Sequence, residues 1–222
     1  MRFTIVRSAA VLAVVACLSG CGGSGHTPIS ASVAGGTRFQ PASKTFTITT
    51  PAGWKGLNSN TLSEAANDAA RRNPEFASLK AGIVAVGKNP NLVFVVDATK
   101  EGRTVELESG FGVNGIARSS PLDVNLSNAA AEQAVARQYD SQAAQLHFHI
   151  TRVQTTLAGH PALRLTYVMP VHTDAGTVRA READTVLVWG KHVYIVSLTA
   201  PVTSSADYAS TFSRILNSFT IS

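Results

Sequence analysis

Residues 147–199 read HFHITRVQTTLAGHPALRLTYVMPVHTDAGTVRAREADTVLVWGKHVYIVSLT, and this stretch decides the fold. It alternates β-rich runs with short turns, and the runs are residues 147–155, 162–169, 177–189 and 192–199. The turns carry the glycines and prolines typical of tight reversals, and they are Gly159-His160-Pro161, Asp174-Ala175-Gly176 and Gly190-Lys191. Consecutive strands joined by such short turns pair with one another, so the stretch predicts an antiparallel meander.

A helix is predicted on each side of this meander. Residues 128–146 form the first, and its apolar face consists of Ala131, Val135, Tyr139 and Ala143. After the meander, Ser204 and Asp207 have the spacing of a capping box at the start of a last helix. That helix has an apolar stripe made of Tyr208, Phe212, Ile215, Leu216 and Phe219. Such a stripe packs against a sheet, and residues 218–221 follow it as an expected edge strand.

The part of the chain before the first helix mixes shorter elements. The expected strands are residues 45–49, 82–86, 92–98 and, more briefly, 104–108. Residues 61–79 are typical of a helix, in which Pro74 either makes a kink or starts a second short helix. Residues 110–123 are expected to form a glycine-bearing loop. Helices interspersed with an antiparallel meander predict an α+β fold in which helices flank one antiparallel sheet.

The N-terminus carries the features of a bacterial lipoprotein signal. Arg2 and Arg7 precede an apolar segment at residues 8–18, which is too short to span a bilayer. The sequence Leu18-Ser19-Gly20-Cys21 then places small residues directly before a cysteine. We therefore expect residues 1–20 to be removed and Cys21 to carry a diacylglyceryl group. The alternative is an ordinary secretory peptide with a cysteine there by chance. Residues 21–43 are expected to be a flexible tether, and residues 44–222 a single domain.

Composition limits the chemistry that is available. The two cysteines are Cys17, in the segment to be removed, and Cys21, so the mature domain is expected to have neither free thiol nor disulfide. Thiol catalysis, thiolate metal sites and redox exchange are thereby excluded. The net charge of +5 comes without a dense Lys/Arg run or a recognition motif, so nucleic acid is not expected as a partner. A basic face favours anionic lipid heads or wall polymers instead.

Two motifs resemble known sites without completing them. The sequence Gly110-Phe111-Gly112-Val113-Asn114-Gly115 matches a dinucleotide fingerprint, but Pro121 stops the helix that such a site requires. His147 and His149 are two residues apart, which would place two metal ligands on the same face of a strand. However, no third ligand adjoins the pair in the sequence. His160, beside Pro161, is interpreted as a turn residue. We therefore expect a loop rather than a nucleotide site, and a polar strand face rather than a metal site.

The charged and aromatic residues are interpreted structurally. Glu106 and Glu108 have the spacing of a carboxylate pair on one strand face, but a solvated face is the preferred interpretation. The charges of the third meander strand are expected to be solvated or paired across strands, and they are Arg179, Arg181, Glu182 and Asp184. Trp54 and Trp189 are interpreted as core residues, with a pocket lining as the alternative.

Several segments resemble a known family. They are residues 46–48, 51–54, 159–162, 189–191 and 212–219. Together they resemble the PsbP-like fold, which the photosystem II extrinsic protein P shares with the Ran-binding Mog proteins, and most of all the LpqN-type envelope lipoproteins of actinobacteria. The resemblance covers residues 44–222. It implies a central antiparallel sheet flanked by helices, a PsbP-like sandwich, and a non-enzymatic role in binding or assembly.

We therefore expect a lipid-anchored cell-envelope protein at the extracytoplasmic face of the cell membrane. Its expected role is that of a binding or accessory module for envelope proteins, or for their lipid or glycan substrates. No catalytic residue, cofactor or metal is expected, and Cys21 is the one expected modification site. Two alternatives stay open, namely an envelope hydrolase assembled from scattered Ser, His and carboxylate residues, and a carrier with a pocket between helices and sheet.

Overall fold

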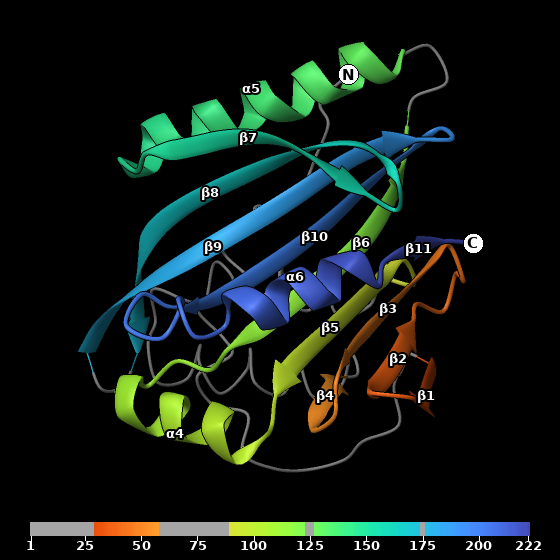
Figure 1. Cartoon of the computed structure of the whole chain (residues 1–222). Helices are drawn as coiled ribbons and strands as arrows, with labels where there is room; N and C mark the ends of the chain where they lie inside the picture. Colours follow the sequence, from red (N-terminus) through yellow and green to blue (C-terminus); the bar gives the residue numbers. More distant parts are fainter. Residues whose placement is uncertain (1–28, 58–88, 123–126, 174–175) are drawn as a thin grey trace.

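A computed structural model describes residues 29–57, 89–122, 127–173 and 176–222, which form two sheets and three helices (Figure 1). The larger sheet contains, from edge to edge, β4 (Trp54–Leu57), β5 (Leu92–Asp97), β6 (Asn114–Pro121), β10 (His192–Pro201), β9 (Gly176–Trp189), β8 (His160–Thr173) and β7 (Ile150–Leu157). The smaller sheet contains β1 (Ile29–Val33), β2 (Gly36–Gln40), β3 (Phe46–Pro51) and β11 (Thr220–Ile221). The helices are α4 (Lys100–Ser109), α5 (Asn128–Leu146) and α6 (Ala209–Asn217). The predicted α+β class is confirmed.

The predicted meander is confirmed. Strands β7, β8, β9 and β10 follow one another in the sheet, and each pairs antiparallel with the next. The register places Tyr167 of β8 beside Glu182 of β9, and Thr199 of β10 on the other side of Glu182. Strand β6 pairs with the free side of β10, which puts a segment from before α5 at the centre of the sheet. Pairing between segments distant in sequence therefore joins the meander to the rest of the larger sheet.

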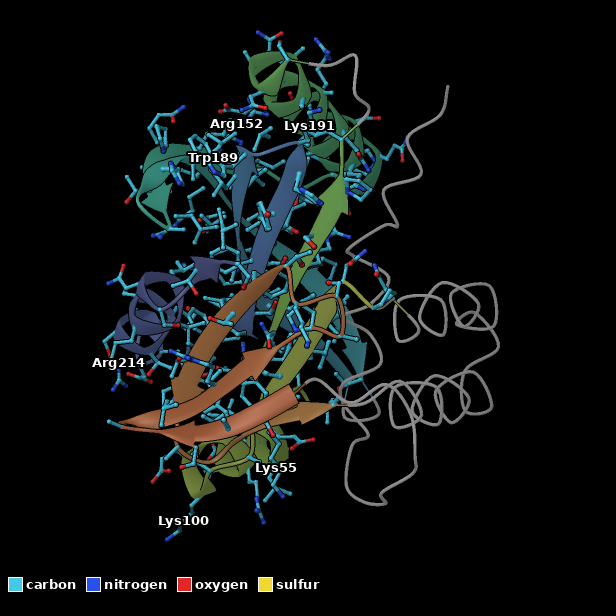
Figure 2. All side chains as sticks on the ribbon, turned by 90° about the vertical axis from the view of Figure 1, so that its right-hand side faces the viewer. Lys55, Lys100, Arg152, Trp189, Lys191 and Arg214 are labelled. Carbon is cyan, nitrogen blue, oxygen red and sulfur yellow. The ribbon has the colours of Figure 1, made fainter. Side chains whose placement is uncertain are left out.

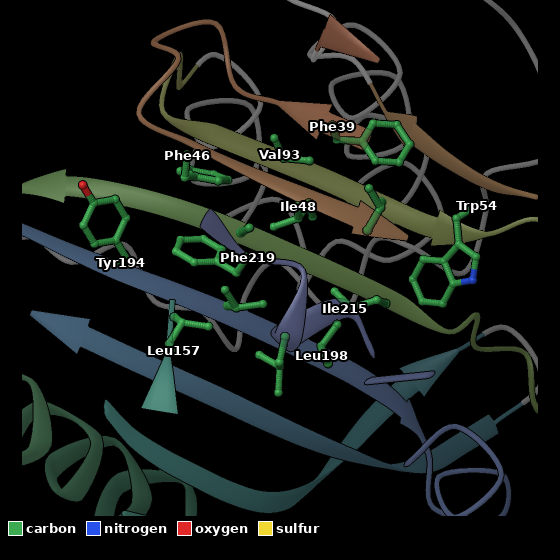
Figure 3. Close-up of a cluster of buried hydrophobic side chains, with 14 of the residues drawn as sticks. Phe39, Phe46, Ile48, Trp54, Val93, Leu157, Tyr194, Leu198, Ile215 and Phe219 are labelled. Carbon is green, nitrogen blue, oxygen red and sulfur yellow. The ribbon is translucent and has the colours of Figure 1, made fainter. Parts of the chain in front are cut away.

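Alternation along the strands separates two cores. One core lies between the sheet and α5, on what we call the α5 face; the other lies between the sheet, α6 and the smaller sheet, on the α6 face. Figure 1 shows α6 and the smaller sheet in front of the larger one. In the α6-face core, shown in Figure 3, Phe219 stacks on Phe46 at 5.3 Å and meets Tyr194 edge-on at 5.9 Å. These ring contacts join the last helix to both sheets.

The long helix α5 begins and ends as its sequence dictates. The Ser127 side chain accepts a hydrogen bond from the Ala130 backbone N–H at 3.2 Å, which satisfies one of the helix's orphan donors. At the other end His147 adopts a left-handed conformation with φ of 55°. Ala131, Val135 and Tyr139 are buried against the sheet, as the sequence predicts.

The predicted tether is wrong for its second half. Strands β1 and β2 occupy residues that we expected to be flexible, and β2 pairs antiparallel with β3. Gly36 allows β2 to approach β3 closely, since a Cβ at this position would lie 1.8 Å from the Thr50 carbonyl oxygen. Small and polar residues thus permit close backbone pairing that hydrophobic periodicity does not reveal. Residues 21–28 lie outside the described ranges.

Two predictions between residues 100 and 123 are also wrong. Residues 104–108 belong to helix α4, because the Thr99 side chain caps it at the Gly102 N–H and Gly110 ends it with φ of 69°. The expected loop at residues 110–123 contains β6, a central strand that pairs with β5 and β10. The glycine fingerprint therefore opens a strand rather than a helix and cannot cradle a pyrophosphate.

The last helix begins later than the capping box predicts. Ser204 and Asp207 lie in consecutive turns, and α6 starts at Ala209 without a side-chain cap. The apolar stripe nevertheless packs as expected, with Phe212 partly buried and its other members buried, and β11 is an edge strand of the smaller sheet. The predicted helix at residues 61–79 and strand at 82–86 lie outside the described residues. None of the described helices is both long and apolar enough to cross a membrane.

Candidate functional site

An acid pair lies buried in the α5-face core. Glu182 and Asp184 are two residues apart on β9, so both side chains point to the same face of the sheet. They are 1% and 0% exposed. The prediction that these carboxylates are solvated is therefore wrong. Arg179 and Arg181, which point to the opposite face, are exposed as predicted.

The acid pair has aromatic and cationic neighbours from three other elements. The Tyr167 hydroxyl of β8 donates a hydrogen bond to Asp184 Oδ2 at 3.0 Å. Tyr139 comes down from α5 and packs against Tyr167, with ring centroids 6.3 Å apart. Arg118 of β6 favours the charged form of Glu182, but it is a weaker influence than burial. The pair is thus enclosed by the helix above and the strands on both sides.

Electrostatics in this core favour protonated groups. Burial, and then the adjacent Asp184, raise the pKa of Glu182 well above its ordinary value of 4.5. Burial and Asp184 likewise raise the pKa values of Tyr139 and Tyr167 far above the usual range. Ionising both neighbouring carboxylates costs free energy because their negative charges repel, so the pair favours a state that holds a proton.

Not every polar atom of this core is satisfied. Among the described residues, three atoms of this group are buried without a hydrogen-bond partner of good geometry, and they are Glu182 Oε2, Asp184 Oδ1 and the Tyr139 hydroxyl. Each unsatisfied buried group costs free energy of about 1–3 kcal/mol. The acid pair is therefore a costly feature of the core. No group of three or more His, Cys, Asp or Glu among the described residues is arranged to hold a metal.

A small cavity lies between α5 and strands β6 and β10. Its volume is about 90 Å³, and its walls are mainly apolar, with Arg118, Ser120 and Gln138 as polar members. It is smaller than the roughly 150 Å³ that accepts benzene and far below the roughly 300 Å³ of typical ligand sites. This cavity admits at most a short apolar group.

Two larger hollows open to solvent. The first, which we call the α6 groove, has a volume of about 460 Å³ and lies between the β7–β8 turn and the end of α6. It is lined by Thr156, Ala158, Gly159, His160, Leu216, Asn217, Phe219, Thr220 and Ile221. The second, the α4 cleft, has about 810 Å³ and lies between α4, the start of β9 and the turns before α6. It contains Glu108, Arg179 and Asp207. Both have the size of ligand sites.

The α6 groove includes an aromatic stack that the sequence did not predict. His160 and Trp189 are cross-strand neighbours on the α6 face, and their rings stack with centroids 3.7 Å apart and planes at 19°. Trp189 is 44% exposed, whereas Trp54 is buried in the α6-face core. The core interpretation is confirmed for Trp54 and wrong for Trp189. His160 begins β8 and lines the groove.

The other candidate residues do not assemble. His147 ends helix α5 while His149 lies beyond it, so the two do not share a strand face. Glu106 and Glu108 belong to helix α4, where residues two apart point in different directions. Burial raises the pKa of Glu106, and Glu108 is exposed. Cys21 lies outside the described residues.

A sequence signal for the acid pair did exist. Ala180, Glu182, Asp184 and Val186 are in phase on β9, and this phase puts both acids between apolar residues that face the core. The face assignment was therefore available from alternation alone. The partners were not, because Tyr167, Tyr139 and Arg118 come from separate elements.

The fold is PsbP-like, with a seven-stranded antiparallel sheet, a smaller sheet and three helices among the described residues. The solution structure of the cyanobacterial PsbP protein (CyanoP) from Synechocystis sp. PCC 6803 is similar, with a TM-score of 0.54 and 13% identity. The similarity covers 92% of this chain and 99% of that one. At this identity the likeness establishes the fold.

Two further structures show weaker similarity. LpqN of Mycobacterium tuberculosis, described as involved in cell envelope biogenesis, has 14% identity and a TM-score of 0.46 over 80% of this chain and 83% of that one. The Ran-binding protein Mog1p of Saccharomyces cerevisiae has 9% identity and a TM-score of 0.46 over 87% and 96%. No family model matches the sequence, and no curated protein matches it.

Proposed function

We propose that this chain is a lipid-anchored cell-envelope protein that acts as a non-enzymatic binding or accessory module. The proposed anchor is a diacylglyceryl group on Cys21, and the proposed location is the extracytoplasmic face of the cell membrane. Both rest on the basic start, the short apolar segment and the Leu-Ser-Gly-Cys sequence. The proposed partners are envelope proteins or their lipid or glycan substrates.

One observation supports the binding role, namely that the buried acid pair is separate from the accessible hollows in the described part of the chain. Glu182 and Asp184 are enclosed beneath α5, while the α6 groove and the α4 cleft are open and of ligand size. A general acid or base has to come within hydrogen-bond reach of its substrate. This arrangement supports recognition of a partner rather than its chemical conversion.

The hydrolase alternative lacks an assembled site among the described residues. It requires a histidine bonded to a serine or a carboxylate. His160 of the α6 groove stacks on Trp189, and His192 Nδ1 bonds to the Gly190 carbonyl at 3.1 Å. The carrier alternative is limited by volume, because the cavity under α5 is about 90 Å³.

Site-specific crosslinking in native envelope tests the proposal. Photo-crosslinking residues at Asn217, in the α6 groove, and at Thr203, in the α4 cleft, are compared with one at Gln133, on the exposed side of α5. We expect a discrete crosslinked product from the groove or the cleft and a much weaker one from Gln133. Equal labelling at all three positions, or none, would contradict the binding role.

A further inference from the structure

We propose that the α6 groove binds a neutral carbohydrate, with one sugar ring beside His160 and its hydroxyl groups bonded to Asn217 and the neighbouring threonines. This inference rests on the proposed binding role and assigns a ligand class to one of the two open hollows.

The lining of the α6 groove has no strong charge. None of its nine described residues is Asp, Glu, Lys or Arg, and its only titratable side chain is His160. Recognition of a phosphate or carboxylate uses Arg or Lys, and recognition of an ammonium group uses acids or an aromatic cage. The α4 cleft, by contrast, carries charges of both signs. The α6 groove therefore suits an uncharged ligand.

The polar side chains of the groove both donate and accept hydrogen bonds. Thr156, Asn217 and Thr220 are exposed there, and hydroxyl and amide groups combine the two roles. The Asn217 amide has no hydrogen-bond partner among the described residues, whereas the Thr220 hydroxyl already shares one with Thr47 at 2.7 Å. Sugar hydroxyl groups also donate and accept, so they match this lining better than a purely accepting or purely donating ligand.

The aromatic wall supplies a surface for the apolar face of a sugar ring. His160 lines the groove, and its ring stacks on Trp189 with ring centroids 3.7 Å apart. Aromatic faces are electronegative, so they attract the weakly positive C–H groups of a sugar. Trp189 does not line the groove and acts as a positioning residue that fixes the orientation of the His160 ring. Figure 2 shows Trp189 at the end of the sheet, with Lys191 nearby.

The size of the groove agrees with this ligand class. About 460 Å³ is within the range of small-molecule sites, and the floor is formed by the buried side chains of Leu216 and Phe219. Leu216 lies at the end of α6 and Phe219 directly after it, and the packing of Phe219 on Phe46 holds this segment against the sheets. The groove is thus built on rigid elements.

Titration of the full-length chain with maltohexaose and cellohexaose tests the inference. We expect saturable heat in calorimetry with at least one of the two sugars. Asn217→Ala should weaken binding about two- to tenfold, as expected for one neutral hydrogen bond. Trp189→Ala, measured by calorimetry, should weaken it by a similar factor.

Lys191→Gln is the matched control, since it changes the same end of the sheet without touching the groove. It should bind the sugars as the unaltered chain does. Wild-type affinity in both Asn217→Ala and Trp189→Ala, or no response to either hexaose, would overturn the assignment. Binding only to vesicles of anionic lipid, with loss in Lys191→Gln, would show a membrane contact instead. A crosslinked product at Asn217 without sugar binding would refute the ligand class and leave the binding role standing.

Discussion

Replacement of Glu182 by glutamine tests the buried acid pair through the pH dependence of stability. In the folded chain, burial and the neighbouring Asp184 raise the pKa of Glu182 above 4.5. In the unfolded chain the same carboxyl ionises near that ordinary value. Unfolding therefore releases a proton at any pH between the two pKa values. The contribution to stability is fully present below pH 4.5 and is lost as the pH rises through the folded pKa.

The size of the effect follows from this proton. Each pH unit between the two pKa values lowers the free energy of unfolding by about 1.4 kcal/mol, so a rise from pH 5 to pH 7 removes at most about 2.7 kcal/mol. Glutamine is neutral in both states and has nearly the same shape, so Glu182→Gln should abolish this slope. At pH 7 the variant should be the more stable protein.

Guanidinium denaturation at pH 5, 6 and 7 measures the effect, with tryptophan fluorescence as the probe of unfolding. Glu108→Gln is the control, since Glu108 is an exposed acid of α4 and its replacement should leave the slope unchanged. The reasoning is refuted if the unaltered chain and Glu182→Gln lose stability in parallel between pH 5 and pH 7.

Three further predictions concern other parts of the molecule. Tyr208→Phe should cost about 1–3 kcal/mol in chemical denaturation, because it removes the 2.7 Å hydrogen bond that the Tyr208 hydroxyl donates to buried Asp97; an unchanged midpoint would contradict this. Gly102→Ala should destabilise by about 1–3 kcal/mol, because a Cβ there would lie 2.5 Å from the Asp97 carbonyl oxygen. A wild-type denaturation curve would show that α4 shifts freely. Cys21→Ala should abolish incorporation of labelled palmitate and retention in the membrane fraction, and persistent labelling would refute the proposed anchor.

The meander was predictable because its information is local. Turn residues at Gly159 and Gly190 and strand alternation between them define hairpins without help from distant parts of the chain. Helix α5 was equally accessible, since Ser127 and the apolar positions Ala131 and Val135 lie within two turns of one another. These elements form much of the larger sheet and one of its covering layers.

The elements that the sequence did not predict depend mainly on contacts with other parts of the chain. Residues Asn114–Pro121 are strand β6 because β5 and β10 bond to them from either side, and glycine and serine allow a close approach that propensity does not favour. Helix α4 depends on the Thr99 cap, which outweighs the strand preference of Thr104 and Val105. In the candidate sites, the contact of His160 with Trp189 requires knowledge of the register between β8 and β9.

The early start of β1 sets the distance at which the module can work. If Cys21 carries the anchor, only seven residues separate it from Ile29. A chain of that length spans at most about 29 Å when fully extended, roughly the diameter of a small domain. The folded module would then remain close to the membrane. A wall polymer or a protein partner would have to approach the bilayer to meet it, which favours ligands that are themselves made or displayed at that surface.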